Sequence, residues 1–235
     1  EKIFIEEAGV IAGAARYINH AERQALLVDL MSMDALDTSA IEGEYLVRES
    51  VHSSIQKVLG LKANNHTATP AEQGIAEVMV DLYQTMPDQL NKKILCNWHQ
   101  HMMQGRQHLS QIGVYRTHTE SMQIVSGPDY ARKIHFEAPP SSEVAIEMQK
   151  FLAWFEKTSP QHSGALSSIT RAGIAHLWFE SIHPFEDGNG RIGRVIAEKA
   201  LGQGCQQFNI IILAKTLLKR RKAYYQALGA ASKTL

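Results

Sequence analysis

Apolar residues recur at helical spacing along most of the chain. In residues 20–38 they fall mostly on one stripe, the pattern of an amphipathic helix: Leu26, Leu27, Leu30, Met31 and Leu36. Gly43 interrupts this pattern, and a second helix is predicted after it; its apolar positions are Val51, Ile55, Val58 and Leu59. The same spacing predicts helices over residues 90–103, 144–155, 166–181, 191–201 and 215–231, and one that contains Ile75, Val78, Met79 and Leu82.

Residues 113–140 follow a different pattern. Met122 and Ile124 alternate with polar neighbours, and Gly127 with Pro128 supplies a turn. This alternation predicts two short strands, in a hairpin or an extended flap rather than a large sheet. The expected fold class is therefore mainly α with one small β element.

A polar segment divides the chain. Residues 62–73 include Asn64, Asn65 and Pro70 and are predicted to form a loop. We place a domain boundary there, between an N-terminal helical region of residues 1–62 and a main body of residues 63–235.

The charge balance limits the expected partners. The chain has 24 basic and 24 acidic residues, which argues against nucleic acid or an anionic membrane held by bulk electrostatics.

Cys96 and Cys205 form no Cys-x-x-Cys pair, so neither a disulfide framework nor a structural zinc site is expected. No stretch has the apolar length of a membrane span, and no signal peptide opens the chain. A cytoplasmic location is expected, although a chain that begins with Glu1 is expected to be a fragment, which gives missing signals little weight.

Residues 183–194, between two predicted helices, combine several residue types that bind phosphate or take part in catalysis. Their sequence is His-Pro-Phe-Glu-Asp-Gly-Asn-Gly-Arg-Ile-Gly-Arg. Pro184 stops the first helix, and Gly188, Asn189 and Gly190 are residue types that tolerate tight turns and positive φ. A turn that leads directly into a helix gathers backbone N–H groups at the positive end of the helix dipole. Such an arrangement binds phosphate groups.

The charged residues of the same segment suit a polyphosphate. Arg191 and Arg194 are three residues apart, so both guanidinium groups are expected on one helix face as bidentate phosphate donors. The carboxylate of Asp187 has the hard oxygens that Mg²⁺ prefers. His183, with an ordinary pKa of about 6.5, can accept a proton from a hydroxyl near neutral pH. The Gly-Lys-Ser/Thr ending of a Walker A loop is absent.

The segment resembles the signature of the Fic family, His-x-Phe-x-Asp/Glu-Gly-Asn-Gly-Arg-x-x-Arg, with every fixed position present. The resemblance covers roughly residues 20–232. It includes four further stretches: Trp98-His99, Gly113-Val114-Tyr115-Arg116, Ala138-Pro139-Pro140 and Phe179-Glu180-Ser181-Ile182. The resemblance implies a Fic-type helical bundle with a short β-hairpin flap.

The resemblance also implies an activity, transfer of AMP from ATP to a Ser, Thr or Tyr hydroxyl of a protein target. His183 would deprotonate the hydroxyl, whose oxygen attacks the α-phosphate and releases pyrophosphate. Asp187 would hold Mg²⁺ against the phosphates, and Arg194 would bind the γ-phosphate. The other implied nucleotide-binding residues are Gly188, Asn189, Gly190, Arg191 and Gly193 in the motif, with Tyr224 and Tyr225 beside the adenosine.

Two further parts of the family pattern are present. The stretch Ile124, Val125, Ser126 and Gly127 resembles the flap that docks an extended target segment by strand addition. Residues 38–43, Thr-Ser-Ala-Ile-Glu-Gly, resemble the Ser/Thr-x-x-x-Glu-Gly/Asn inhibitory motif of the subclass that carries its inhibitory helix N-terminal to the core.

The inhibitory motif implies a brake. Glu42 would pair with Arg194 and withhold it from the γ-phosphate, so that the α-phosphate of bound ATP is turned away from attack. A charge-assisted pair of this kind contributes about 1.5–3 kcal/mol. In some relatives the same glutamate assists removal of AMP, which adds a hydrolytic role for Glu42 to the expectations.

Several alternatives remain open at this stage. A Fic-type enzyme can transfer UMP or another group, and a nucleotide-sensing regulatory module would need no transferase activity. The expected partner is a protein hydroxyl, on another protein or on this chain itself, and a homodimer is a further expectation. The sequence identifies neither the target nor what releases Glu42.

Overall fold

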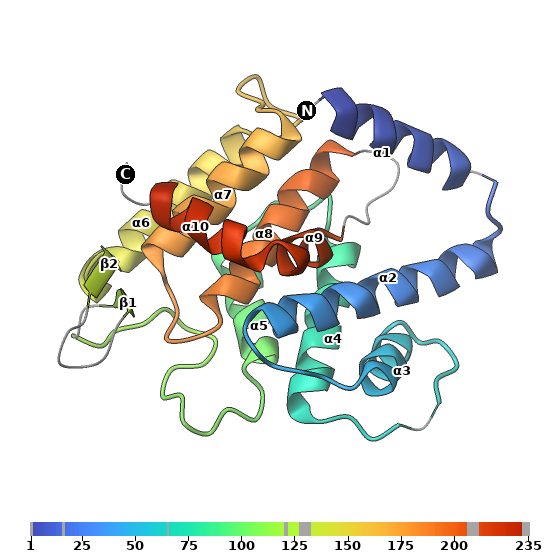
Figure 1. The fold of residues 1–235 in the computed structure, drawn as a ribbon, viewed down its shortest axis with the longest axis horizontal. Coiled ribbons are helices and arrows are strands. Elements are labelled where there is room, and N and C mark those ends of the chain that lie inside the picture. The colour runs from blue at the N-terminus through green and yellow to red at the C-terminus, as the bar shows by residue number, and fades with distance from the viewer. Residues whose placement is uncertain are drawn as a thin grey trace.

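Figure 1 shows a mainly helical chain, as the sequence predicts. The computed structural model describes residues 2–15, 17–64, 66–119, 122–126, 133–205 and 212–231. Its elements are α1 (Lys2–Ala15), α2 (His20–Ile41), α3 (Arg48–Val58), α4 (Pro70–Gln84), α5 (Lys92–Met102), β1 (Gln123–Ser126), β2 (Lys133–Glu137), α6 (Ser141–Lys157), α7 (Ser168–Ile182), α8 (Asn189–Gly204), α9 (Leu213–Lys219) and α10 (Arg221–Ala231). In this described part of the chain, no helix has both the length and the apolar composition that crossing a membrane requires.

The long helix α2 begins at a clear start signal. The side chain of Asn19 accepts a hydrogen bond from the Glu22 N–H (3.0 Å), and Glu22 accepts one from the Asn19 N–H in return, which is a capping box. The helix runs to Ile41, a little beyond its predicted end, and Glu42 is its C-cap. Gly43 then takes a φ of +81°, which glycine adopts without a steric penalty. α2 packs against α3, α4, α8 and α9.

Helices α7 and α8 form the centre of the fold and lie side by side in Figure 1. α8 is buried along almost its whole length. Phe151 of α6 contacts Phe155 and Phe179, with ring centroids 6.1 and 6.0 Å apart. Phe185, from the loop between α7 and α8, stacks on His99 at 4.1 Å and so ties this loop to the core. Buried aromatic rings supply much of the hydrophobic stabilisation of such a core.

A buried acidic pair joins the N-terminal region to the main body. Asp34 of α2 and Glu198 of α8 share a hydrogen bond, and at the start of α9 the Ala214 N–H donates to Oδ1 of Asp34 and the Leu213 N–H donates to Oε1 of Glu198. Burial raises the pKa of Asp34 to about 6 and holds that of Glu198 well above its usual range. α2 is therefore an integral part of the core, and the domain boundary near residue 62 stays a prediction.

The polar loop before α4 is shorter than predicted. α4 begins at Pro70, so the loop predicted over residues 62–73 is wrong from that residue onward. Thr69 and Glu72 form a second capping box, and Pro70 occupies the first turn, where its missing N–H is not needed. Glu72 also accepts a hydrogen bond from the Val47 N–H (2.8 Å), which anchors the segment before α3.

The C-terminal segment forms two helices, so the single helix predicted over residues 215–231 is wrong. α9 and α10 are separated by Arg220, with φ −116° and ψ 29°. Neither glycine nor proline marks this break, which is why the pattern did not reveal it. No helix was predicted over α1, where Ile3, Val10 and Ile11 are mostly exposed and define no core-facing stripe.

Strands β1 and β2 pair antiparallel, with a register irregularity between Ile124 and Val125. Next to the paired residues Gln123 and Glu137, the Ala138 N–H donates a hydrogen bond to the Met122 carbonyl (2.9 Å). The predicted turn at Gly127 and Pro128 lies outside the described residues. The role of this segment as a flap therefore stays a prediction.

Two glycines provide a matched test of helix packing. A Cβ at Gly74 of α4 would lie 1.8 Å from the carbonyl oxygen of His101 of α5, whereas a Cβ at Gly173 of α7 would meet nothing within 4 Å. Gly74→Ala is expected to destabilise the fold by about 1–3 kcal/mol, because α4 and α5 must separate. Gly173→Ala is expected to stabilise it by up to about 1 kcal/mol, because alanine favours helix. Urea unfolding measures both, and a stabilising Gly74→Ala would contradict this packing.

Candidate active site

The loop between α7 and α8 turns at two residues. His183 ends α7 with φ +51° and ψ 59°, and it is the one non-glycine residue with positive φ in the described part of the chain. This left-handed conformation is uncommon for a residue with a Cβ and persists where neighbouring contacts enforce it. Gly188 is the second, with φ +76° at the N-cap of α8. Asn189 and Gly190 already belong to α8, so their prediction as turn residues is wrong.

Arg116 enforces the conformation at His183. Its buried guanidinium donates from Nε to the His183 carbonyl (2.7 Å), from Nη2 to the Pro139 carbonyl (2.6 Å) and from Nη1 to the Ser141 hydroxyl (2.9 Å). Its backbone N–H donates to the Pro184 carbonyl (2.8 Å). One side chain thus fixes the end of α7 relative to the start of α6. In the sequence, Arg116 is part of a stretch that resembles the family, and no role is predicted for it.

His99 and Asn189 hold the rest of the loop. The Gly113 N–H donates to Nδ1 of His99 (2.8 Å), so Nε2 carries the proton and donates to the Asp187 carbonyl (3.1 Å). Burial lowers the pKa of His99 to about 4, which keeps this ring neutral. The Asn189 side chain makes two hydrogen bonds to the backbone of Phe185 (3.0 and 2.9 Å). Sequence reasoning had proposed Asn189 as a phosphate contact and had assigned no function to His99.

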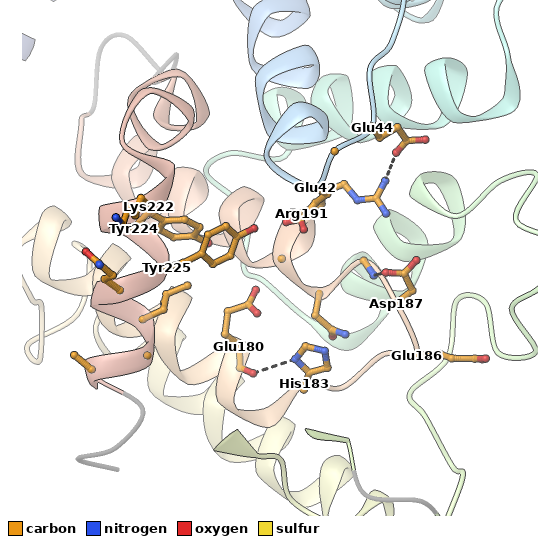
Figure 2. Close-up of a pocket in the computed structure, with 18 of the residues that line it drawn as sticks. Glu42, Glu44, Glu180, His183, Glu186, Asp187, Arg191, Lys222, Tyr224 and Tyr225 are labelled. Atoms are coloured by element: carbon orange, nitrogen blue, oxygen red, sulfur yellow. Dashed lines mark hydrogen bonds and ion pairs between the residues drawn. The ribbon is translucent and has the colours of Figure 1, made fainter. Parts of the chain in front are cut away.

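His183 has the protonation state that a general base needs. Its Nδ1 lies 3.3 Å from the Glu180 carbonyl (Figure 2), and a carbonyl can only accept, so Nδ1 carries the proton and Nε2 is a free acceptor. Burial lowers the pKa of His183 below its ordinary value, and the positive charge of Arg116 lowers it further. The imidazole is therefore neutral near pH 7.

The predicted contact between Glu42 and Arg194 is present. Nη2 of Arg194 lies 2.8 Å from Oε1 of Glu42, and its Nε donates to the Thr38 hydroxyl (2.7 Å). The Arg194 side chain is only 1% exposed. Burial alone would lower the pKa of Arg194, but the Glu42 carboxylate and Tyr224 together more than compensate and the pKa is raised. Gly190 makes room for this pair, since a Cβ there would lie 2.5 Å from Oε1 of Glu42.

A second carboxylate from the same segment contacts the other motif arginine. Glu44 accepts from Nη1 of Arg191 (2.7 Å) and from Nη2 of Arg106 (2.5 Å). Arg191 and Arg194, expected to point together at a phosphate, are thus each paired with a carboxylate from the turn after α2. Neither Glu44 nor Arg106 was predicted as a site residue, because nothing in the local sequence of either one indicates this contact.

The loop between α7 and α8, the turn after α2 and helix α10 line one open cleft of about 1630 Å³. Its walls include most of the predicted site residues: Glu42, His183, Asp187, Gly188, Asn189, Gly190, Arg191, Tyr224 and Tyr225. Figure 2 shows both tyrosines on α10 facing His183 and Asp187 across the cleft. Among the described residues, Gly193 and Arg194 are not part of its lining.

Glu180 is a cleft residue whose role sequence reasoning missed. It lies one turn before His183, and its Oε1 is buried with no hydrogen-bond partner among the described residues. A Cβ at Gly193 would lie 2.7 Å from this oxygen and 2.9 Å from Nδ1 of His176, so Gly193 has a packing role here. Nε2 of His176 forms a hydrogen bond with the Tyr224 hydroxyl (2.7 Å). Burial raises the pKa of Glu180 to about 7.

Asp187 is suited to share a metal ion with a ligand. Its Oδ1 accepts the Gly188 N–H (2.6 Å), and the residue lines the cleft beside Arg191. No group of three or more His, Cys, Asp or Glu residues that could hold a metal occurs in the part of the chain that the structure describes. A single carboxylate fits Mg²⁺ only when phosphate oxygens and water complete the coordination.

Comparisons with known proteins agree with this architecture. Residues 89–201 match the model of the Fic/DOC family, and residues 1–61 match a family described as a domain of unknown function (DUF4172). A Fic family protein from Desulfovibrio desulfuricans shares the fold over 98% of this chain and 67% of its own (TM-score 0.65, 24% identity). Fic-1 from C. elegans does so over 98% of this chain and 63% of its own (TM-score 0.67, 18% identity). Residues 89–201 of this chain therefore belong to the Fic/DOC family.

Curated relatives match over a shorter stretch. The protein adenylyltransferase Fic of Drosophila virilis is 33% identical over 94 residues, which are 40% of this chain and 18% of that protein. The protein of the same name in Drosophila melanogaster is 32% identical over a stretch of the same length. The match thus spans less than a fifth of these relatives.

Glu180 makes stability depend on pH in a predictable direction. A carboxyl whose pKa is raised from 4.5 to about 7 by folding stabilises the fold below pH 4.5, and this stabilisation is lost as the pH rises through 7. Glu180→Gln stays neutral, so the melting temperature of the wild type relative to this variant is expected to fall between pH 5 and pH 8. Glu186→Gln is the control, because the pKa of Glu186 lies below its ordinary value and outside this window. Parallel wild-type and Glu180→Gln profiles would contradict a buried neutral carboxyl.

Proposed function

We propose that this chain is a protein adenylyltransferase, which transfers AMP from ATP to a Ser, Thr or Tyr hydroxyl and is held inactive by Glu42. The observation that carries the proposal is the meeting of a neutral His183, the N-terminus of α8 and the buried Arg191 in one cleft, whose wall also includes Glu42, the partner of the buried Arg194. A base beside an anion-binding helix terminus suits group transfer from a polyphosphate. The names of the Drosophila relatives, protein adenylyltransferase Fic, support adenylyl transfer.

The chemistry follows from the position of His183. Nε2 of His183 accepts the proton of the target hydroxyl, the hydroxyl oxygen bonds to the α-phosphorus, and the bond to the departing pyrophosphate breaks. The N–H groups at the start of α8 and the arginines Arg191 and Arg194 stabilise negative charge on the phosphates. Arg116 acts earlier, because it fixes the backbone of His183 before substrate arrives.

Asp187 and the tyrosines complete the substrate site in this proposal. Asp187 would hold Mg²⁺, which would supply neutralisation of phosphate charge when bound. Tyr224 and Tyr225 border the adenosine, and the rings lie 5.0 Å apart at the far wall of the cleft. Strand β1, with Ile124, Val125, Ser126 and the following Gly127, docks an extended part of the target.

The contact between Glu42 and Arg194 supports restraint in cis. The carboxylate occupies the guanidinium that binds the γ-phosphate, so a triphosphate is bound without its productive alignment. Release requires that Glu42 leave Arg194, and self-association into a dimer is a route that would couple release to assembly. A hydrolytic role of Glu42 in AMP removal is a further part of the proposal.

The first experiment follows transfer of label from α-labelled ATP with Mg²⁺ to the protein itself and to a lysate. Glu42→Gln keeps the size of the side chain and removes its charge, and it is expected to raise transfer about 10- to 150-fold, the equivalent of a pair worth about 1.5–3 kcal/mol. Glu42→Gln combined with His183→Ala is expected to give none.

The same assay separates the alternatives. A released variant that binds ATP but transfers label only from UTP or another nucleotide would identify a Fic-type transferase of another group. A released variant that binds ATP and transfers nothing from any donor would contradict the enzyme and favour a nucleotide-sensing module.

The proposed metal role gives a separate prediction. In the Glu42→Gln background, Asp187→Asn removes a metal-binding charge and keeps the side-chain volume. The Mg²⁺ concentration for half-maximal transfer is expected to rise about tenfold or more. Affinity for ATP without Mg²⁺ is the control and should not fall. An unchanged Mg²⁺ requirement would exclude Asp187 as the ligand.

A further inference from the structure

The turn after α2 presents two carboxylates to α8. Gly43 donates its N–H to the Ala40 carbonyl and Glu44 donates its N–H to the Ser39 carbonyl, both at 3.0 Å. This tight turn reverses the chain directly after Glu42. Glu42 and Glu44, two residues apart, therefore both reach α8, where the two arginines of the motif are three residues apart.

Glu44 bridges two arginines. One of its oxygens accepts from Arg191 (2.7 Å) and the other accepts from Arg106 (2.5 Å), which lies in the segment after α5. The side chains of Glu44 and Arg106 are 24% and 27% exposed, and that of Arg191 is 6% exposed. Figure 2 shows the Glu44 carboxylate directed at Arg191 at the wall of the cleft. Arg106 also lines this cleft, at a position that no motif includes.

The closed site leaves buried donors unsatisfied. Nε of Arg191 and Nη1 of Arg194 are buried and have no hydrogen-bond partner among the described residues. Buried N–H groups without partners are costly, and an oxygen-rich anion in the cleft would satisfy them. The two glutamates therefore neutralise the charges of the two arginines, but each guanidinium group keeps an N–H donor that is not used.

We infer that Arg106 and Arg191 form an outer part of the polyphosphate site and that Glu44 is a second acidic latch, which closes this part while Glu42 closes Arg194. The inference rests on the nucleotide site of the proposed function. Release of Glu42 alone frees one arginine and leaves the other two paired with Glu44. A triphosphate that engages all three must displace both carboxylates, and Arg106 then binds phosphate oxygens.

Nucleotide affinity tests the latch without requiring any transfer. MgATP and AMP are titrated against wild type, Glu44→Gln, Glu42→Gln and the double variant. Glu44→Gln is expected to bind MgATP about three- to tenfold more tightly than wild type, and the double variant more tightly than either single one. AMP, which lacks the outer phosphates, is expected to bind nearly equally to all. Glu49→Gln removes an exposed charge on α3 and should leave both affinities unchanged.

These affinities distinguish two possible roles of Glu44: a latch that competes with the nucleotide, or a support that orients Arg191 for it. If Glu44 orients Arg191 for the nucleotide, Glu44→Gln weakens MgATP binding, and the inference is overturned. An unchanged affinity overturns it as well. Thermal unfolding verifies that each variant is folded. If MgATP binding responds as expected but no variant transfers AMP, the proposed reaction fails while the latch stands.

Arg106 is tested in the released protein. In the Glu42→Gln, Glu44→Gln background, Arg106→Gln is expected to weaken MgATP about three- to tenfold and to leave AMP unchanged. Equal loss for MgATP and AMP would indicate a general disturbance of the cleft, and no loss would show that Arg106 does not bind phosphate. Either result removes Arg106 from the polyphosphate site.

Discussion

The buried guanidinium of Arg194 constrains everything around it. A cation that is 1% exposed in the middle of a helical core needs an anionic partner, because the desolvation of an unpaired charge is prohibitive. In this structure the partner is Glu42, at the end of a helix that is itself packed into the core. A nucleotide that brought phosphates to Arg194 would offer the same compensation. In the proposed function the protein chain and the ligand compete for one cation, and this competition is the physical basis of the proposed restraint.

The other essential constraint is the backbone of His183. The left-handed conformation directs the imidazole toward the cleft, and it depends on Arg116, whose hydrogen bonds reach the end of α7 and the start of α6. His99 and Asn189 fix the remainder of the loop through its backbone. Arg116, His99 and Asn189 thus act mainly on the geometry of this loop. The few groups left to contact a substrate are held by a rigid surrounding structure.

The sequence predicted the parts of the site that a family motif covers. The motif from His183 to Arg194 and the contact from Glu42 to Arg194 followed from a family pattern. The start of α2 agreed with its apolar stripe. Glu44, Arg106 and Arg116 were missed as site residues because their contacts join segments 62 to 147 residues apart, and no periodicity encodes such pairs. The break between α9 and α10 was missed because Arg220 carries no helix-breaking signal. Glu180 appeared only as part of a resemblance, since the pKa of a carboxyl is set by burial that the sequence alone does not reveal.

The central claim is that Glu42 and the γ-phosphate bind the same guanidinium. The most direct measurement compares the affinities of MgATP and MgADP in wild type and in Glu42→Gln. In the wild type the two nucleotides should bind nearly equally, because the γ-phosphate finds Arg194 already paired. In Glu42→Gln, MgATP should bind about tenfold more tightly than MgADP, the ratio expected for a recovered charge-assisted hydrogen bond. An ATP to ADP ratio that is the same in both proteins would contradict the account.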